Sequence, residues 1–318
     1  MPNTPKTLLL AAPRGYCAGV DRAVVTVERA LAEHGAPVYV RKEIVHNKHV
    51  VEQLRASGAI FVDELSDEIP AGAVTVFSAH GVSPAVHEDA KARGLETIDA
   101  TCPLVTKVHI EAKRFAEDGY TVILVGHAGH EEVEGTMGEA PNSVVLVETE
   151  EDVDKLEFTE GDKLALVTQT TLSVDETSVI IARLKGRFPQ IVSPKLDDIC
   201  YATTNRQLAV KNLANKCDLV LVIGSANSSN SNRLVDVTRE LGTDAYLIDN
   251  EGEVQEEWLV GKETVGITSG ASAPEELVQR LVEFFRARGT EEVREVTVIE
   301  ENVRFMLPKA VRDTVIAD

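Results

Sequence analysis

Short apolar runs alternate with segments of helical periodicity along the whole chain. The run TLLLAA at 7–12 leads into a segment in which Val20, Val24, Val27 and Leu31 recur at helical spacing. Further apolar runs, bounded by turn residues, are typical of buried strands. They are AVTVFSA, YTVILVG, KLALVTQ, DLVLVIG and ETVGITSG. This alternation of strands with helices predicts an α/β protein.

A block of about 90 residues recurs three times, which indicates a repeat architecture. In each block a cysteine ends an extended run and opens a helical segment with an Arg or Lys one to two turns in. The cysteines are Cys17, Cys102 and Cys200, the extended runs are 7–12, 95–101 and 194–199, and the cations are Arg22, Lys107 and Arg206. The segments FSAHGVS, VTQTTLS and ITSGAS also correspond. We therefore expect three related α/β lobes in a pseudo-threefold, trefoil-like arrangement rather than one doubly wound sheet.

The repeat also predicts the limits of the lobes. We expect lobe one at 13–100, lobe two at 101–196 and lobe three at 197–290. The strand before each later cysteine completes the preceding lobe, so the N-terminal strand 6–12 should complete the third. Residues 291–318, which include the strand-like run VREVTVIEE, fall outside the repeat and are expected to form a covering tail.

Charge and composition narrow the possible partners. The chain has 318 residues, with 32 Lys and Arg against 52 Asp and Glu, and a formal net charge of −20. This charge repels polyphosphate backbones and anionic membrane surfaces, so neither nucleic acid nor a membrane is an expected partner. No apolar run approaches the roughly 20 residues that span a bilayer, and the N-terminal segment lacks the features of a signal peptide. We expect a cytoplasmic enzyme.

Polar side chains follow the predicted strands in every lobe. Ligand-binding residues of α/β lobes gather where strands end and helices begin, because backbone N–H groups and the helix dipole face that side. Helix capping is the simpler explanation for any one of these residues, and a glutamate in a first helical turn is often only solvated. Capping does not explain why one lobe has an imidazole and a carboxylate there while the others have hydroxyls, amides and imidazoles. The residues are His46, His80, His130, Glu132, Thr170, Ser228, Ser229, Asn230 and Ser272.

The spacing of the cysteines matches neither a disulfide scaffold nor a CxxC zinc site. Cys217 begins an apolar run and is expected to be a small buried hydrophobe. The three repeated cysteines are compatible with a zinc ion that keeps one open position, with redox thiols, or with a 4Fe-4S cluster that has one iron without a protein ligand. A threefold array around a central cavity suits such a cluster, because three irons are anchored and the fourth faces the substrate.

Long motifs in a fixed order resemble those of the 4-hydroxy-3-methylbut-2-enyl diphosphate reductase (IspH/LytB) family, over essentially residues 7–318. The resemblance implies an oxygen-sensitive 4Fe-4S oxidoreductase that ends the methylerythritol phosphate route to isoprenoids. Such an enzyme removes the allylic hydroxyl of its substrate with two electrons and two protons, giving isopentenyl and dimethylallyl diphosphates. The motifs are PRGYCAGVDRA, VHNKHVVEQL, FSAHGVSPAV, DATCPLVTKVH, GHAGHEEVEGTMG, TQTTLSVDET, DDICYATTNRQ, GSANSSNSNRL, QEEWL and TSGASAPE.

The resemblance assigns roles to the residues that match its motifs. It implies Cys17, Cys102 and Cys200 as cluster ligands and Glu132 as proton donor. It also implies that Thr170 holds the substrate hydroxyl or relays a proton to it. The diphosphate and hydroxyl contacts fall on His46, His80, His130, Thr170, Ser228, Ser229, Asn230 and Ser272. A ferredoxin or flavodoxin is the implied electron donor.

One position departs from the family pattern, because Glu131 replaces the proline that usually separates the histidine from the catalytic glutamate. We expect Glu131 and Glu134 to be solvated or paired away from the site. We also expect His130 to precede the helix, since it can share a site with Glu132 only from that position.

Two other functional classes remain open on the residues alone. A non-redox iron-sulfur hydro-lyase acting on a phosphorylated substrate would use the open iron only as a Lewis acid. A sensor would use the cluster to report oxygen or iron status. Electron consumption distinguishes the reductase from the hydro-lyase, and turnover distinguishes both from a sensor.

Overall fold

The computed structural model describes residues 4–194 and 197–312 and divides the chain into two compact units. Unit 1 contains 4–20, His46–Glu52 and Tyr201–Arg304. Unit 2 contains Asp21–Val45, Gln53–Cys200 and the segment from Phe305 onward.

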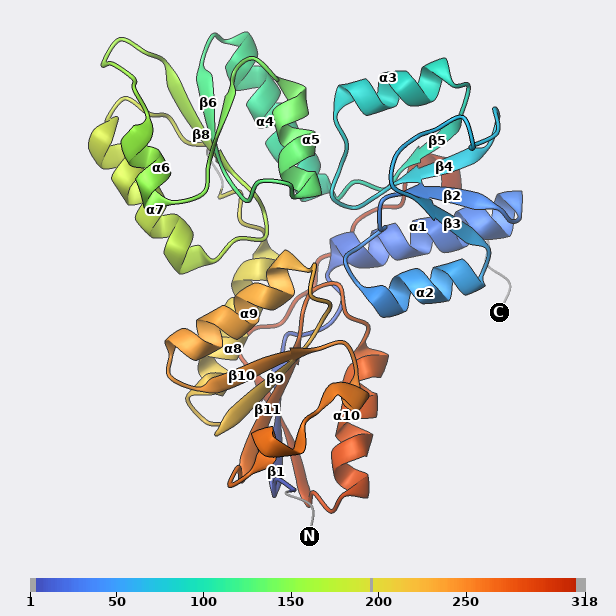
Figure 1. Cartoon of the computed structure of the whole chain (residues 1–318), viewed down its shortest axis with the longest axis vertical. Helices are drawn as coiled ribbons and strands as arrows, with labels where there is room; N and C mark the ends of the chain where they lie inside the picture. Colours follow the sequence, from blue (N-terminus) through green and yellow to red (C-terminus); the bar gives the residue numbers. More distant parts are fainter. Residues whose placement is uncertain (1–3, 195–196, 313–318) are drawn as a thin grey trace. The chain divides into compact units, whose positions relative to one another are not determined.

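Unit 1 is built on a parallel sheet with strand order β10-β9-β11-β1-β12 (Figure 1). Its strands are β1 (Thr7–Ala12), β9 (Leu219–Ile223), β10 (Asp244–Ile248), β11 (Thr264–Ser269) and β12 (Glu292–Thr297). Its helices are α8 (Tyr201–Ala214), α9 (Ser229–Glu240) and α10 (Glu275–Ala287), with the 3-10 turns η1 (Glu251–Glu253) and η2 (Glu256–Leu259). The N-terminal strand therefore lies inside the sheet that the third repeat forms.

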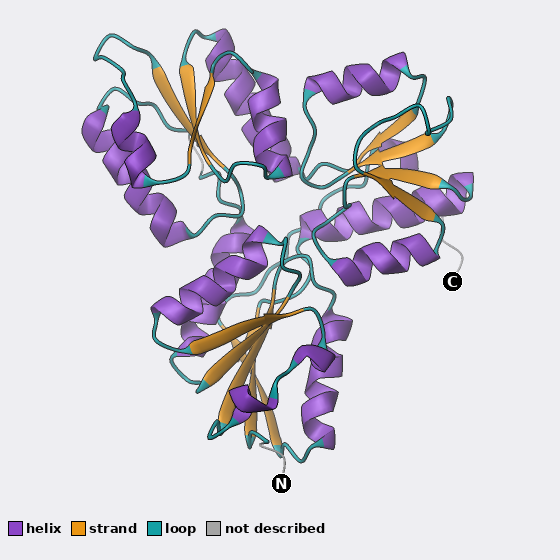
Figure 2. Cartoon of the chain, in the orientation of Figure 1, coloured by secondary structure: helices purple, strands orange, loops and turns teal. Residues whose placement is uncertain are grey.

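Both faces of this sheet are buried, as expected for parallel strands covered by helices. Side chains alternate along β1, so Leu8 and Leu10 pack on the apolar face of α10, whereas Leu9 and Ala11 pack against α8 and α9. The same two-sided burial holds for β9, in which every residue is buried. The unit accordingly has a helix layer on each side of its strands (Figure 2).

Unit 2 holds two further parallel sheets, with strand orders β3-β2-β4-β5 and β7-β6-β8. The strands are β2 (Val38–Arg41), β3 (Ala59–Val62), β4 (Val74–Phe77), β5 (Glu96–Asp99), β6 (Thr121–Val125), β7 (Val144–Val147) and β8 (Leu164–Thr168). The helices that lie wholly in this unit are α3 (Pro84–Ala92), α4 (Pro103–Glu117), α5 (Glu131–Glu139), α6 (Glu150–Lys155) and α7 (Val174–Arg187), with the 3-10 turn η3 (Lys309–Val311). Helices α1 (Ala18–His34) and α2 (Lys48–Ala56) begin in residues of unit 1 and continue into unit 2.

The predicted α/β fold is confirmed, and every strand pair is parallel. The expected entry of the N-terminal strand into the third sheet is also confirmed, because β1 pairs with β11 from Thr7 opposite Thr264 onward. The predicted tail contains a strand, β12, and this strand extends the same sheet by pairing with the other edge of β1. The limits proposed for the three lobes stay a prediction.

The strand expected at 194–199 is wrong for the described part of that run. Within residues 191–194 and 197–200, the backbone makes one isolated bridge, at Val192 opposite Ala165, and no strand. Residues 195 and 196 lie outside the described residues. The Asp198 carboxylate instead accepts the backbone N–H of Thr168 at 2.9 Å, where a paired strand would offer a carbonyl.

The acidic segment EEDVDKLEF contains the short helix α6. Thr149 and Asp152 form a capping box at its start, in which each side chain accepts the backbone N–H of the other residue. This pair satisfies N–H groups that a short helix otherwise leaves without partners.

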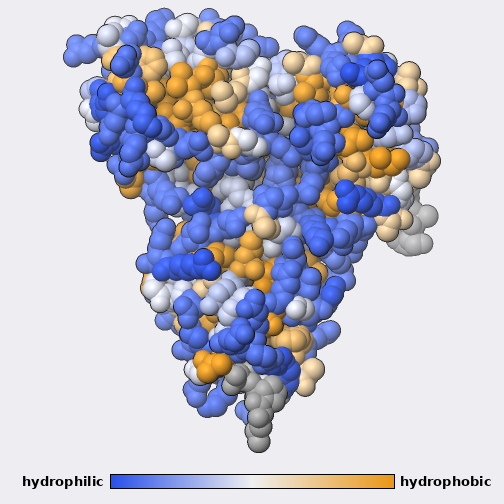
Figure 3. All heavy atoms as spheres, viewed as in Figure 1, coloured by the Kyte–Doolittle hydropathy of each residue, from blue (hydrophilic) through white to orange (hydrophobic). Residues whose placement is uncertain are grey.

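Hydrophilic residues make up most of the surface visible in Figure 3, with small apolar patches between them. Among the described residues, no helix combines the length and the apolar composition needed to cross a membrane.

Candidate active site and cysteine loops

The three repeated cysteines share one backbone environment. Each donates its N–H to the carbonyl of the second residue after a strand: Cys17 to Ala271 after β11 (3.2 Å), Cys102 to Ala79 after β4 (3.0 Å), and Cys200 to Thr170 after β8 (3.0 Å). The loops that carry these carbonyls are those whose sequences correspond in the repeat. The equivalence inferred from the sequence is therefore present in the hydrogen bonds.

Each of these cysteines also stands directly before a helix. Cys17 precedes α1, Cys102 is the N-cap of α4 with Pro103 next to it, and Cys200 precedes α8. The Val20 N–H, in the first turn of α1, donates to the Cys17 Sγ at 3.5 Å. The unpaired N–H groups and the dipole of a helix face such a position and favour negative charge there.

Cys217 lies in a different environment. It packs against the apolar cluster between β9 and helices α8 and α9, beside Leu213. Burial raises the pKa of its thiol to about 12. Cys217 therefore stays a protonated, hydrophobic thiol, as the sequence predicts, and lacks the character of a metal ligand.

Glu132 is a buried acid on the first turn of α5, with 2 % of its surface exposed. Its Oε1 accepts the backbone N–H of Thr170 at 2.6 Å, and its Oε2 accepts the Thr170 hydroxyl at 3.1 Å. Burial raises the pKa of Glu132 to about 7, although these hydrogen bonds act in the opposite direction. Because Oε1 must accept from the backbone, the proton of the neutral acid belongs on Oε2.

His130 lies before the helix, as expected. It is the N-cap of α5, with extended backbone angles of φ −78° and ψ 134°, and its Nδ1 accepts the Glu132 N–H at 3.1 Å. In the neutral ring the proton is then on Nε2. The His80 ring packs edge-on against His130, with 5.8 Å between the ring centroids. Unit 2 thus brings His80, His130, Glu132 and Thr170 together.

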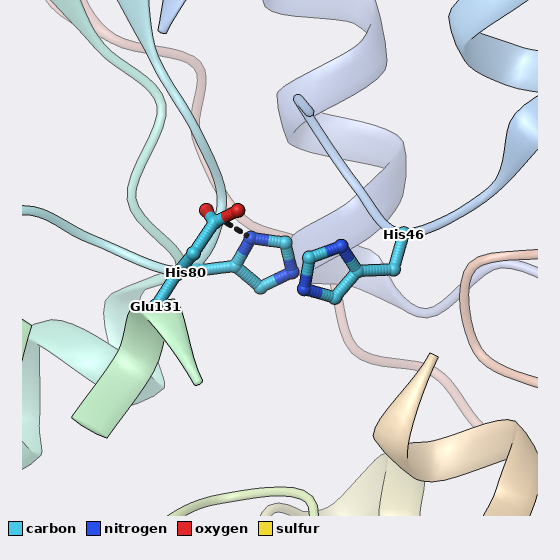
Figure 4. Close-up of side chains that lie close together, drawn as sticks. All are labelled: His46, His80 and Glu131. Carbon is cyan, nitrogen blue, oxygen red and sulfur yellow. Dashed lines mark hydrogen bonds and ion pairs between the residues drawn. The ribbon is translucent and has the colours of Figure 1, made fainter. Parts of the chain in front are cut away.

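Glu131 does not fit the prediction that it is solvated or paired away from the site. Its Oε2 lies 3.2 Å from His80 Nδ1 and accepts the Ser78 hydroxyl at 3.3 Å, and Figure 4 shows the carboxylate directed at the His80 ring. A carboxylate only accepts hydrogen bonds, so Nδ1 of His80 carries a proton. The sequence could not indicate this pair, because the two residues are 51 positions apart. Glu134 is exposed, as expected.

Unit 1 carries a second polar cluster, at the carboxyl ends of β9 and β11. The Ser228 hydroxyl lies 2.9 Å from that of Ser231 and 3.4 Å from that of Ser272, and it accepts the Asn230 side-chain amide at 2.9 Å. Asn230 Oδ1 in turn accepts the Ala271 N–H at 2.7 Å. Four hydroxyl and amide side chains therefore form one hydrogen-bonded group.

His46 joins this group through its backbone. The Ser272 hydroxyl donates to the His46 carbonyl at 2.9 Å, and the Asn227 amide lies 3.4 Å from His46 Nδ1. Ser229 is the first residue of α9, directly after Ser228. Capping does not explain Ser228, because its side chain forms no cap hydrogen bond with α9.

Comparison with known proteins decides the family. A family model described as the LytB protein matches residues 8–286. The chain belongs to the LytB family. The match confirms the resemblance drawn from the motifs, and it spans every predicted site residue from Cys17 to Ser272.

Similar proteins in this LytB family bear the name 4-hydroxy-3-methylbut-2-enyl diphosphate reductase. One from Cutibacterium acnes is 60 % identical over 310 residues, which cover 97 % of this chain and 96 % of that protein. One from Nocardia farcinica is 59 % identical over 313 residues, which cover 98 % and 93 %. The solved structure of E-1-hydroxy-2-methyl-but-2-enyl-4-diphosphate reductase from Plasmodium falciparum matches with a TM-score of 0.94 and 41 % identity, covering 96 % of this chain and 97 % of that one.

Sequence reasoning missed several residues of the LytB chain's polar clusters. Ser231 and Asn227 were not singled out, although both lie in the polar loop SANSSNSN. Gly270 was missed as well: a Cβ there would lie 2.0 Å from Ser231 Oγ and 2.9 Å from Asn230 Oδ1. A glycine between a strand and a run of small polar residues was the available signal, since such glycines allow a close approach of the backbone.

Proposed function

We propose that this chain reduces 4-hydroxy-3-methylbut-2-enyl diphosphate to isopentenyl and dimethylallyl diphosphates. The allylic C–O bond breaks, two electrons and two protons are taken up, and the hydroxyl leaves as water. The observation that carries the proposal is the set of contacts around Thr170. Its N–H and hydroxyl bind the buried acid Glu132, and its carbonyl accepts the N–H of Cys200.

Glu132 serves as the proton donor in this proposal. A carboxyl group with a pKa of about 7 is substantially protonated at neutral pH and transfers its proton readily when a basic oxygen develops nearby. The proton on Oε2 lies beside the Thr170 hydroxyl, which can pass it on or hold the substrate hydroxyl. Burial also keeps water from competing for that proton.

Cys17, Cys102 and Cys200 would hold a 4Fe-4S cluster. The donor set fits, since thiolate is the ligand that such clusters use and each of the three stands at a helix start with its N–H anchored on a post-strand carbonyl. A cluster held by three cysteines supplies electrons and one open iron that acts as a Lewis acid. A small electron carrier such as a ferredoxin or flavodoxin would reduce it.

The hydroxyl and amide cluster of unit 1 would bind the diphosphate. Ser228 and Asn230 are neutral donors at the start of α9, where backbone N–H groups favour anions, and the Ser272 hydroxyl lies 3.4 Å from that of Ser228. Imidazoles would add further donors. Binding of this kind explains how a chain with a net charge of −20 can take an anionic substrate.

Electron counting under anaerobic conditions tests the proposal. With a chemically reduced viologen as donor, two electrons should be consumed for each substrate molecule, and Glu132→Gln should slow that consumption by about 10²–10⁴-fold while the cluster stays loaded. Turnover without electron consumption would indicate the hydro-lyase. A loaded cluster with no turnover would indicate a sensor, and either result rejects the reductase.

A further inference from the structure

Each cysteine of the repeat is followed by a cation that binds the loop of the next cysteine. Arg22 and Lys107 stand five residues after Cys17 and Cys102, and Arg206 stands six residues after Cys200. Each cation donates a hydrogen bond to a backbone carbonyl one to three residues before another cysteine. Arg22 binds before Cys102, Lys107 before Cys200, and Arg206 before Cys17. Each cysteine loop is therefore held by the cation that follows another cysteine in the sequence.

Arg22 holds the loop of Cys102. Its Nη1 donates to the Thr101 carbonyl at 3.0 Å, directly before the cysteine, and its Nε donates to the Met306 carbonyl at 2.9 Å. Both acceptors are neutral backbone groups. Within the described residues Arg22 forms no ion pair, so its positive charge is not cancelled by direct contact with a carboxylate.

Lys107 holds the loop of Cys200. Its Nζ donates to the Asp197 carbonyl at 3.2 Å and to Asp198 Oδ1 at 2.8 Å. The other oxygen of Asp198 accepts the Thr168 N–H at the end of β8. Asp198 thus connects the cation to the strand whose following loop anchors Cys200.

Arg206 holds the loop of Cys17. Only 1 % of its surface is exposed, and its guanidinium donates twice to the Gly15 carbonyl, at 2.7 and 3.2 Å, and to the Tyr16 carbonyl at 3.4 Å. Its Nη1 pairs with Glu301 at 3.0 Å. Burying a charge is costly unless it is paired and hydrogen-bonded, and this guanidinium meets both conditions.

Ordinary scaffolding would explain one such contact but not its repetition. The residues on either side of the three cations differ in sequence, and the acceptor loops share only an aspartate three residues before the cysteine in two of the three, Asp99 and Asp197. The shared features are the place of the cation after one cysteine and the place of its acceptor before another. A carbonyl that is held one to three residues before a cysteine restrains the backbone that carries that cysteine.

We propose that Arg22, Lys107 and Arg206 are positioning residues that hold the three cysteine loops in the geometry a cluster requires, and that Arg22 also tunes the cluster's reduction potential. The inference rests on the proposed function, because it needs the cluster. Lys107 and Arg206 are paired with Asp198 and Glu301, so their main effect is on cluster retention. Among the described residues Arg22 has no direct ion pair and is influenced by Asp99 only through space, and it interacts electrostatically with Cys102, so its positive charge favours the reduced, more negative cluster.

The test measures cluster content and reduction potential in anaerobically reconstituted protein. Arg22→Met should keep the cluster but shift the reduction equilibrium about tenfold toward the oxidised form, which is about 59 mV for a one-electron couple. Arg22→Lys should restore most of the potential. Lys107→Met should release iron to a chelator about 10- to 100-fold faster, as for the loss of other groups that orient metal ligands.

Two further variants complete the design. Arg206→Lys keeps the buried positive charge but removes the planar set of N–H donors. The variant should therefore keep the fold and lose iron faster than the wild type. Arg239→Met is the matched control, because Arg239 also donates two hydrogen bonds to one backbone carbonyl, that of Ala245, outside the cysteine loops. It should change neither the potential nor iron release.

The results distinguish a failure of the proposed function from a failure of the inference about the three cations. Wild-type protein that takes up no iron and sulfide would reject the proposed function. A loaded wild type, together with Arg22→Met, Lys107→Met and Arg206→Lys variants that match Arg239→Met in potential and iron release, would overturn this inference alone.

Discussion

Thr170 is the residue at which the acid and a cysteine loop meet. Its side chain and N–H bind Glu132 and its carbonyl binds Cys200, so a shift of this one residue moves both groups. The repeat sequence predicts that the residue lies after a strand. It does not predict that Thr170 binds Glu132, because that contact joins positions 38 residues apart.

The pH dependence of the reaction should follow Glu132. Because the acid must be protonated to donate, kcat/KM should fall as pH rises through about 7. Glu132→Gln should lower turnover by about 10²–10⁴-fold and remove this limb of the profile. The exposed Glu134→Gln variant should keep the wild-type profile. If Glu134→Gln lost its turnover while Glu132→Gln stayed active, Glu134 and not Glu132 would be the proton donor.

Stability should depend on the same group. The pKa of Glu132 is raised on folding from an ordinary value of 4.5 to about 7, so the folded state binds more protons than the unfolded state between these values. The free energy of unfolding should therefore decrease as pH rises from about 4.5 to about 7, and this decrease should be smaller in Glu132→Gln. Denaturant titrations of both proteins across this window measure the difference, and equal slopes would refute the raised pKa.

Glu131 should matter for substrate binding through His80. Glu131→Ala removes the acceptor that fixes the ring, so KM should rise about three- to tenfold with little change in kcat, since such a hydrogen bond contributes about 1 kcal/mol. Glu131→Gln keeps an acceptor oxygen and should bind nearly as well as the wild type. Steady-state kinetics of the two variants decide this, and an unchanged KM in Glu131→Ala would show that the pair is incidental.

At the level of elements, the strands and helices follow the hydrophobic pattern closely. The pattern predicted β1, α1 and β12 because their apolar spacing is regular. It failed before Cys200, where the Asp198 carboxylate accepts the N–H of Thr168 at the end of β8. A carboxylate that replaces a backbone acceptor leaves no trace in hydrophobic periodicity.

The loop between β11 and α10 should tolerate no side chain at Gly270. The Cβ of Gly270→Ala would overlap Ser231 and Asn230, so we expect a loss of about 1–3 kcal/mol in the free energy of unfolding and weaker binding of free diphosphate. Gly186→Ala is the control: it lies in α7 with no atom within 4 Å of the added Cβ and should raise stability by about 0.4–1 kcal/mol. Calorimetry measures both quantities. Unchanged diphosphate affinity in Gly270→Ala would separate this loop from the anion site.

At the scale of the whole chain, the threefold repeat predicted the number of sheets but not their sizes. The described residues form sheets of five, four and three strands. The largest gains β1 and β12 from the two ends of the chain, and the smallest lacks the expected strand before Cys200. The repeat nevertheless places all three cysteines alike, since each binds the second residue after a strand. The common position of the three cysteines, each after an extended run and directly before a helix, is therefore the most informative feature of the sequence.

The iron and sulfide content of four cysteine variants tests the central claim most directly. After anaerobic reconstitution, wild type and Cys217→Ser should each hold about four iron and four sulfide ions per chain, whereas Cys17→Ser, Cys102→Ser and Cys200→Ser should lose the cluster. Cys217 is the internal control because its thiol packs in the apolar core. A colourless wild type with stoichiometric zinc, or a loss at Cys217→Ser as large as at the other three, would contradict the account.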